Sequence, residues 1–450
     1  MIATAPAATM TPTSSRRRQR PTAIAIPSIL SHSFVGRRHY GTSDSGNNSN
    51  SKSSNRNDSV SPPISTIDCE NSNIDDVGAT GSTNLAKGTI GISADDTTSD
   101  PSMVTWVDDY LPAYARPYAH LSRMDKPIGT WLLLWPCFWS TAMAAGVSPV
   151  EVDDTKSLIA ASGQFTTPTT LMDVLPDPKL LGLFTIGAFV MRGAGCTIND
   201  LWDRDLDSQV TRTKNRPLAA GILTPAQAVG WLAAQLSVGL AVLVSLPHTE
   251  YCFWWGASSL PIVVAYPLMK RFFDYPQLVL GLCFNWGAFM GWAAVHGTMD
   301  YHVVLPLYAS GVAWTIGYDT LYAHQDKDDD AKLGLKSTAI SFGKFGKSHD
   351  KAMEGTNGDE DRHKRVLYGF AAVTYASWML AGYNNFVGST GIPFGAYGLG
   401  ITGAYTHLLW QIQTADLSNP HNLAERFRSN AKVGGIVFGS ILAGKLAMLV

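Results

Sequence analysis

The sequence predicts an all-α protein that crosses a membrane many times. Only 16% of its 450 residues are charged, against roughly 25% in a typical soluble domain. After residue 105, apolar segments of about 17–21 residues recur to the C-terminus, which is the length a helix needs to cross the hydrocarbon core. These features exclude a soluble globular fold. A formal net charge of −2 argues against a nucleic-acid binder that depends on bulk positive charge.

Nine apolar segments divide the chain. They are 128–147, 180–198, 226–246, 251–269, 278–296, 302–318, 366–383, 391–411 and 433–450. With nine spans, the loops that follow the even-numbered spans share one face with the N-terminus. That face carries eighteen Lys and Arg in its loops, whereas the loops of the other face carry two. Because positive charge accumulates on the inner face of membrane proteins, span count and charge distribution support the same topology.

The N-terminal 105 residues differ from the rest of the chain. Residues 1–43 contain six arginines, no lysine and no acidic residue, a composition typical of a mitochondrial transit peptide. A basic tail without a targeting role is the alternative. Residues 44–105 are too poor in apolar side chains to form a core, so we expect disorder there, and 106–450 form the membrane domain. A transit peptide predicts the mitochondrial inner membrane, with the basic face toward the matrix.

Four polar residues follow the second predicted span on the basic face. Asn199, Asp203 and Asp207 are spaced four residues apart, and Asp200 lies beside Asn199. If the helix continues beyond its span, these side chains lie along one helical face. Stacked carboxylates repel one another, so this arrangement requires counter-charge.

A second acidic cluster follows the sixth predicted span, on the same face. Asp326 and Asp330 are four residues apart, and Asp319 lies two turns upstream. Oxygen ligands suit Mg²⁺, which is usually bound by one or two carboxylates together with substrate phosphates. Two such clusters on facing helices predict a diphosphate site bridged by Mg²⁺, which would stabilise charge on a leaving group. The alternative is that both clusters are solvated loop acids beside the membrane.

Five cations lie in or near the predicted spans. Arg192 lies inside the second span, where a charged residue is costly and indicates function; pairing with an acid in the membrane is the alternative. Lys270 and Arg271 end the fourth span, and Arg123 and Lys126 precede the first. These four either bind anionic groups of a substrate or anchor the spans at the membrane interface.

The motifs around these residues resemble those of the membrane-embedded aromatic prenyltransferases, the UbiA superfamily. The pattern Asn199-Asp200-x-x-Asp203-x-x-x-Asp207 matches the first signature of that family, and Asp326-x-x-x-Asp330 matches the second. The resemblance extends in order over residues 110–450. Further segments similar to the 4-hydroxybenzoate branch of the family are 123–129, 134–136, 191–196, 266–271, 319–326 and 336–339.

This resemblance implies an enzyme of ubiquinone biosynthesis whose substrates are a long polyprenyl diphosphate and 4-hydroxybenzoate. It also implies that the enzyme contacts membrane lipid and other proteins of ubiquinone biosynthesis. It implies a cavity among the helices that opens sideways to lipid for the isoprenoid tail. It also implies catalytic acids at both motifs. The implied Mg²⁺ ligands are Asn199, Asp203, Asp326 and Asp330, with Asp200 and Asp207 in support.

The resemblance implies roles for the cations as well. Lys270, Arg271 and Arg192 would add positive charge near the diphosphate as its C–O bond ionises. Arg123 or Lys126 would hold the carboxylate of the benzoate.

Two alternatives to this function remain. A haem O synthase-type prenyltransferase normally lacks the full acid pattern of the first motif. A non-enzymatic membrane carrier also uses intramembrane arginines and acidic rings, but it does not require helically spaced acids on two spans of one face.

Overall fold

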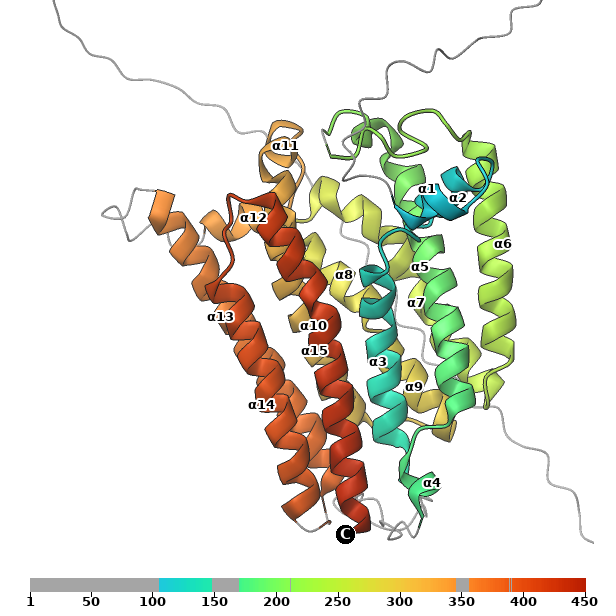
Figure 1. Ribbon diagram of the computed structural model, residues 1–450, viewed down its shortest axis with the longest axis vertical. Helices are drawn as coiled ribbons and strands as arrows, with labels where there is room; N and C mark the ends of the chain where they lie inside the picture. The colour runs from blue at the N-terminus through green and yellow to red at the C-terminus, as the bar shows by residue number, and fades with distance from the viewer. Residues whose placement is uncertain (1–104, 148–169, 211, 345–355, 388, 390) are drawn as a thin grey trace, which may run out of the picture. The chain divides into compact units, whose positions relative to one another are not determined.

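The structure is a computed structural model that describes residues 105–450 except 148–169, 211, 345–355, 388 and 390 (Figure 1). These residues belong to one unit, Ser93–Val450, and they form helices without strands, as the sequence predicts. The transit peptide predicted at 1–43, and all but the last residue of the disordered segment predicted at 44–105, lie outside the described residues. The α-helices are α1 Trp106–Tyr110, α2 Arg116–Leu121, α3 Ile128–Ala144, α4 Leu171–Val174, α5 Pro178–Asp207, α6 Pro225–Val244, α7 Thr249–Phe272, α8 Pro276–Phe284, α9 Gly287–His296, α10 Tyr301–Ala323, α11 Lys327–Lys332, α12 Thr338–Ser341, α13 Thr356–Phe386, α14 Gly391–Gln413 and α15 Pro420–Leu446. Short 3₁₀ helices are η2 His324–Asp326, η3 Phe342–Lys344 and η4 Ala447–Leu449.

In the described part of the chain, helices occupy every predicted span: α3, α5, α6, α7, the pair α8 and α9, α10, α13, α14 and α15. Five helical segments there are long and apolar enough to cross a membrane, which supports a polytopic membrane protein. The total of nine crossings stays a prediction. The five segments are Leu171–Asp207, Pro225–Val244, Thr249–Phe272, Pro276–His296 and Pro420–Leu449.

The fifth predicted span, 278–296, is two helices and not one, because the helix breaks at Asn285. Nδ2 of Asn285 donates to the carbonyl of Gly281 at 2.9 Å and to Oγ1 of Thr315 on α10 at 2.9 Å. A side-chain amide that bonds to nearby groups competes with the helical backbone. The polar contact with α10 thus accounts for the break.

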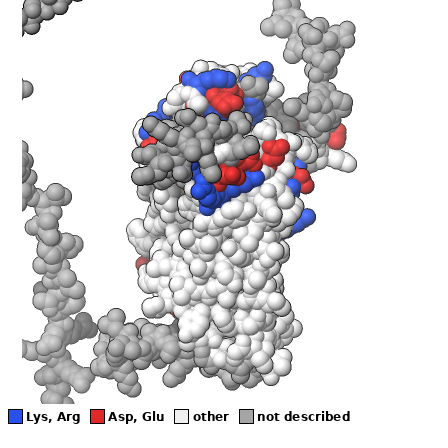
Figure 2. Space-filling view, turned by 90° about the vertical axis from the view of Figure 1, so that its left-hand side faces the viewer, with Lys and Arg blue, Asp and Glu red and all other residues white. Residues whose placement is uncertain are grey.

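The contacts between consecutive helices form a ring in chain order, and Figure 1 shows this bundle from the side. Each long helix packs against the next one along the chain, and α15 returns to pack against α3. On the side of α13 and α14, charged residues gather at one end, and the surface beyond them is uncharged (Figure 2). This pattern is typical of a helical bundle whose uncharged sides face lipid and whose charged end faces water.

One helix is longer than a membrane is thick. α5 has 30 residues, which corresponds to about 45 Å at 1.5 Å per residue, against about 30 Å for a hydrocarbon core. Its start is set by Asp177, whose side chain accepts a hydrogen bond from the backbone N–H of Lys179, and by Pro178 in the first turn. The last turns of α5 therefore extend into the charged end of the ring.

Tryptophans join helices that are distant in the sequence. The ring of Trp139 on α3 is fully buried, 5.4 Å from that of Trp314 on α10 and 6.0 Å from that of Trp378 on α13. Its Nε1 donates to the carbonyl of Gly434 on α15 at 2.9 Å. Buried tryptophan contributes a large apolar area and requires a partner for its N–H. This cluster holds four helices of the ring together.

Two glycines of α9 allow α9 and α3 to approach closely. A Cβ on Gly291 would lie 2.6 Å from the carbonyl oxygen of Cys137 and 2.9 Å from the backbone nitrogen of Thr141, and one on Gly287 would lie 3.0 Å from the nitrogen of Cys137. Small residues at helix contacts permit such packing in membranes. The two backbones are therefore in direct contact.

Replacing Gly291→Ala should destabilise the protein by about 1–3 kcal/mol, because the added methyl group must push α3 and α9 apart. Thermal unfolding of the detergent-purified protein measures the effect. Gly369→Ala on α13 is the matched control, because nothing lies within 4 Å of the methyl group that it would add. An equal melting temperature for the two variants would contradict the close approach.

Candidate active site

The two acidic clusters predicted from the sequence lie at the same end of the ring (Figure 1). The first lies at the C-terminal end of α5, and the second lies on η2 and α11. An ion pair connects them: Arg212, in the loop after α5, binds Asp326, which is 114 residues away in the sequence. The fold thus brings the two clusters together.

The first cluster lies on a continuous helix, as predicted. α5 continues to Asp207, and the side chains of Asp200, Asp203 and Asp207 are buried, with 1%, 6% and 8% exposure. Asn199 is partly exposed. Helical residues three, four and seven apart share a face, so the three carboxylates line one side of the last two turns. Burial of a carboxylate is costly unless it is paired.

Two arginines pair with these carboxylates. Nη2 of Arg123 donates to both carboxylate oxygens of Asp200, each at 3.0 Å. Nη1 of Arg216 donates to Asp200 at 3.1 Å and to Asp207 at 2.6 Å. Arg216 and Arg212 were not among the predicted site residues. Their signal in the sequence was a basic segment directly after the first acidic cluster.

The backbone of Arg123 adopts φ of 55°, a left-handed conformation that costs a non-glycine residue about 1–3 kcal/mol. Nη1 of Arg123 also donates to the carbonyl of His120, on α2, at 3.1 Å. The guanidinium of Arg123 therefore binds Asp200 and the backbone of His120. The sequence predicted instead that Arg123 holds the carboxylate of the benzoate substrate. Lys126, the other residue predicted for that role, is exposed and lies near the arginines of the site.

The second cluster departs from the continuous helix that its spacing suggests. α10 ends at Ala323, η2 carries Asp326, and Asp330 lies in the separate helix α11. The carboxylate of Asp326 accepts two hydrogen bonds from Arg212, from Nε at 2.7 Å and from Nη2. Burial raises the pKa of Asp326, but these bonds outweigh it and hold the pKa below its usual value. Asp330 is buried, with 7% exposure.

The end of α7 supplies the charge that both clusters share. Lys270 lies close enough to interact electrostatically with four acids. Nη2 of Arg271 is 3.7 Å from Oδ1 of Asp203, and the same atom donates to the carbonyl of Trp202 at 2.9 Å. The four acids near Lys270 are Asp203, Asp319, Asp326 and Asp330.

The segment after α11 fixes the end of α7 in place. The backbone N–H of Lys336 donates to the carbonyl of Lys270 at 2.8 Å, and its Nζ donates to the carbonyl of Phe272 at 3.1 Å. Nζ of Lys336 is also 3.0 Å from Oδ1 of Asp274. Lys336 therefore positions Lys270 between the two clusters.

The oxygen atoms of this site fit Mg²⁺ that is shared with a phosphate. Asn199, Asp203, Asp326 and Asp330 offer amide and carboxylate oxygens, the ligands that Mg²⁺ prefers. Among the described residues, no three His, Cys, Asp or Glu are grouped closely enough to hold a metal ion by themselves. Mg²⁺ commonly takes one or two carboxylates and completes its shell with water and substrate phosphates. The donor set suits that mode of binding, not a cage made of protein alone.

Arg192 lies apart from the acids, in the interior of the ring. Its guanidinium is 5.8 Å from the ring centroid of Phe284 on α8, and Nη1 contacts Sγ of Cys196. Its Nε is buried and has no hydrogen-bond partner among the described residues. A buried donor without a partner costs about 1–3 kcal/mol. The interior of the ring therefore offers an unused donor for an anionic group.

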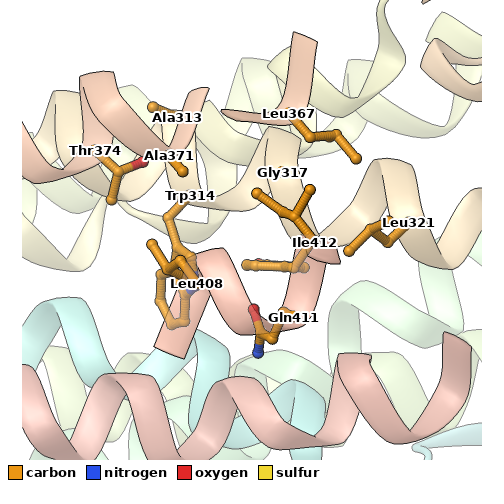
Figure 3. Close-up of a pocket in the computed structure, with 11 residues that line it drawn as sticks. Ala313, Trp314, Gly317, Leu321, Leu367, Ala371, Thr374, Leu408, Gln411 and Ile412 are labelled. Carbon is orange, nitrogen blue, oxygen red and sulfur yellow. The ribbon is translucent and has the colours of Figure 1, made fainter. Parts of the chain in front are cut away.

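A small cavity between α10, α13 and α14 is not part of this site (Figure 3). Its volume is about 20 Å³, and its wall is mostly apolar, including Trp314, Leu367 and Leu408. Such a volume accommodates about one water molecule, so it does not hold a substrate.

Comparison with known proteins gives a consistent result. Residues 133–434 match the UbiA prenyltransferase family. The chain is 45% identical over 341 residues to the Arabidopsis thaliana protein named 4-hydroxybenzoate polyprenyltransferase, mitochondrial, covering 76% of this chain and 72% of that protein. It is 44% identical over 340 residues to the Homo sapiens protein of the same name, covering 76% and 78%.

Solved structures similar to this chain are more distant in sequence. The apo structure of a UbiA homolog from Aeropyrum pernix K1 is 21% identical with a TM-score of 0.48, covering 69% of this chain and 96% of that one. A UbiA homolog from Archaeoglobus fulgidus bound to GPP and Mg²⁺ is 18% identical with a TM-score of 0.46, covering 74% and 99%.

Replacing Arg216→Gln should destabilise the protein by about 3–5 kcal/mol, because it leaves buried carboxylates without their partner. The Arg216 side chain is 18% exposed, and that of Asp207 is 11% exposed. Arg204→Gln is the control, since Arg204 and its partner Asp205 are 45% and 86% exposed and a surface pair contributes at most about 1 kcal/mol. Thermal unfolding of both variants tests this. Similar melting temperatures would rule out a stabilising role for Arg216.

Affinity for Mg²⁺ should fall as the pH is lowered through 6. Burial raises the pKa of Asp330 to about 6, so at pH 5.5 a proton competes with the metal for this carboxylate, and at pH 7.5 it does not. The affinity should be about fourfold weaker at pH 5.5 than at pH 7.5. Titration of the purified protein with Mg²⁺ in the presence of inorganic diphosphate at both values measures this, and Asp330→Asn, which cannot titrate, gives the pH dependence of the diphosphate itself. An equal change in affinity for the wild-type protein and this variant would exclude competition at Asp330.

Proposed function

Because the chain belongs to the UbiA prenyltransferase family, we propose that it transfers a polyprenyl chain from a polyprenyl diphosphate to 4-hydroxybenzoate, a step of ubiquinone biosynthesis. The observation that carries this proposal is the pair of acidic motifs at one end of a membrane bundle, where Arg212 pairs with Asp326 and Lys270 interacts with acids of both motifs. Relatives that are 44–45% identical over three quarters of the chain are named for this reaction. Their names also favour it over a haem O synthase-type enzyme or a carrier.

The acids would bind the diphosphate through Mg²⁺. We assign the metal to Asn199, Asp203, Asp326 and Asp330, whose oxygens suit it. When bound, Mg²⁺ stabilises the negative charge that develops on the leaving diphosphate. Asp200 and Asp207 support the site indirectly, because they hold Arg123 and Arg216 in place.

Two cations of the site would stabilise the diphosphate as it leaves the prenyl chain. Lys270 and Arg271 lie next to Asp203, at the end of α7, and would hold the diphosphate as the allylic C–O bond breaks and its electron pair leaves with the phosphate oxygen. The carbon ortho to the hydroxyl of 4-hydroxybenzoate then forms a bond to the allylic cation, and loss of the proton at that carbon restores the aromatic ring.

Arg192 is the best-placed residue for the carboxylate of the benzoate. Its buried Nε lacks a partner among the described residues, and it lies on α5 two turns before the first motif. Arg123, which the sequence suggested for this role, is occupied by Asp200. A guanidinium in the interior would hold the acceptor ring on the membrane side of the diphosphate, where the prenyl chain would lie.

The location follows from the same features. The relatives are named mitochondrial, and this chain has several apolar helices of membrane-spanning length among its described residues. We propose the inner membrane, with the charged end of the ring and both acidic motifs on the matrix side, because the loops of that face carry the excess of Lys and Arg. Residues 1–43 would serve as the transit peptide.

Prenylation of 4-hydroxybenzoate by the membrane-inserted protein tests the proposed function. With a polyprenyl diphosphate and Mg²⁺, the wild-type protein should form product, and Asp203→Asn and Asp330→Asn should each reduce the rate at least about a hundredfold, because each removes a carboxylate that would hold the Mg²⁺ ion against the leaving diphosphate. Product is quantified with and without Mg²⁺.

Asp205→Asn is the matched control for this experiment. Asp205 lies on the same turn of α5, but its side chain is 86% exposed and pairs with Arg204, so this variant should retain activity. A folded and inserted wild-type protein that forms no product with any prenyl chain length would contradict the proposal.

A further inference from the structure

A basic cluster separate from the active site lies between α14 and α15. It consists of His407 on α14 and of Arg426 and Lys432 on α15, and both cations are close enough to His407 to interact with it electrostatically. The two helices are held side by side here by Gln411, whose Nε2 donates to Oγ of Ser429 at 2.6 Å. We call these three residues the α14–α15 basic cluster.

The side chain of Arg426 is buried between protein groups and is not a solvated surface cation. It is 9% exposed, and its guanidinium lies over the ring of Trp410 at 4.1 Å. Its Nε is buried without a hydrogen-bond partner among the described residues, as is Nε2 of His407. Buried polar atoms are normally satisfied. Two unused polar nitrogens in one cluster therefore indicate a missing ligand.

The charge of the cluster is poorly balanced by the protein. The ion pair that the structure gives Arg426 is loose, with Nη1 3.9 Å from Oε1 of Glu425, and the Glu425 side chain is 57% exposed. Within the described residues, no ion pair reaches Lys432. A ligand with negative charge would therefore be favoured.

The cluster lies at the boundary between the charged end and the apolar part of the ring. Lys432 directly precedes the last predicted span, 433–450, and Trp410 is the last residue but one of the preceding span, 391–411. Gly403, Ile436 and Gly439, which lie within these two predicted spans, are exposed. The uncharged surface that continues from the charged end is visible in Figure 2. Tryptophan and basic residues commonly mark the level of lipid headgroups.

We propose that the α14–α15 basic cluster binds the phosphate of an anionic phospholipid. Arg426, Lys432 and His407 would donate to the phosphate, Trp410 would lie at the headgroup level, and the acyl chains would cover the apolar surface of α14 and α15. Basic pockets between helices on the inner face of membranes bind such headgroups. A lipid satisfies both the unpaired donors and the apolar surface beside them, whereas free phosphate satisfies only the donors.

Thermal unfolding of the full-length protein in detergent tests this proposal, with cardiolipin, phosphatidylcholine or inorganic phosphate added in separate titrations. Cardiolipin should raise the melting temperature, and the other two should not. Lys432→Gln and Arg426→Gln should each shift the midpoint of the cardiolipin titration about fivefold to higher concentration, since each removes one charge near the headgroup. Arg365→Gln is the control, because it removes an exposed arginine of α13 that lies outside the cluster.

The outcomes decide the proposal. If Lys432→Gln and Arg365→Gln respond to cardiolipin like the wild-type protein, the cluster is not a lipid site. If inorganic phosphate alone produces the full shift, the site takes free phosphate and the lipid proposal is wrong. Lys432 is exposed, so Lys432→Gln keeps the test valid if Arg426→Gln does not fold.

Discussion

Carboxylates buried side by side on α5 can exist together only because cations from other parts of the chain reach them. Each of these charges loses hydration on burial, and repulsion between neighbouring acids adds to the cost. Arg123 approaches from before α3, and Arg216 approaches from the loop after α5. The left-handed backbone of Arg123 indicates how strongly this arrangement constrains the fold. The rest of the charged end is organised around this pairing.

The acids of the second motif are likewise paired with cations from other parts of the chain. Arg212 covers Asp326, and Lys270 faces acids of both motifs. A metal-bound diphosphate would enter a region where acids and bases are already matched, so it would exchange partners and not create an isolated charge. With diphosphate bound, Asn199, Asp203, Asp326 and Asp330 would hold Mg²⁺, and the guanidinium and ammonium groups of Arg212, Lys270 and Arg271 would face phosphate oxygens. Such an exchange of partners suits a site with abundant oxygen ligands whose described residues form no metal cage by themselves.

The fold separates two environments that the proposed reaction requires. The ring of helices presents an uncharged surface to lipid, which suits an isoprenoid chain, and its charged end suits a diphosphate (Figure 2). α5 connects the two, because it is longer than the hydrocarbon core and carries Arg192 in the interior and the acids at its end. The Trp139 cluster joins α3, which packs against α5, to α10, α13 and α15.

The sequence by itself determined the helical membrane fold, the helical character of each predicted span and both acidic motifs, because these depend on local properties: apolar length, helical spacing and charge distribution. It did not determine that 278–296 is broken, since the break depends on a side-chain contact between Asn285 and α10. Nor did it identify Arg212 and Arg216 as partners of the acids, or separate Arg123 from the substrate. Only the tertiary structure decided which cation meets which carboxylate, because such pairs join residues far apart in the chain, and local sequence patterns carry no information about that distance.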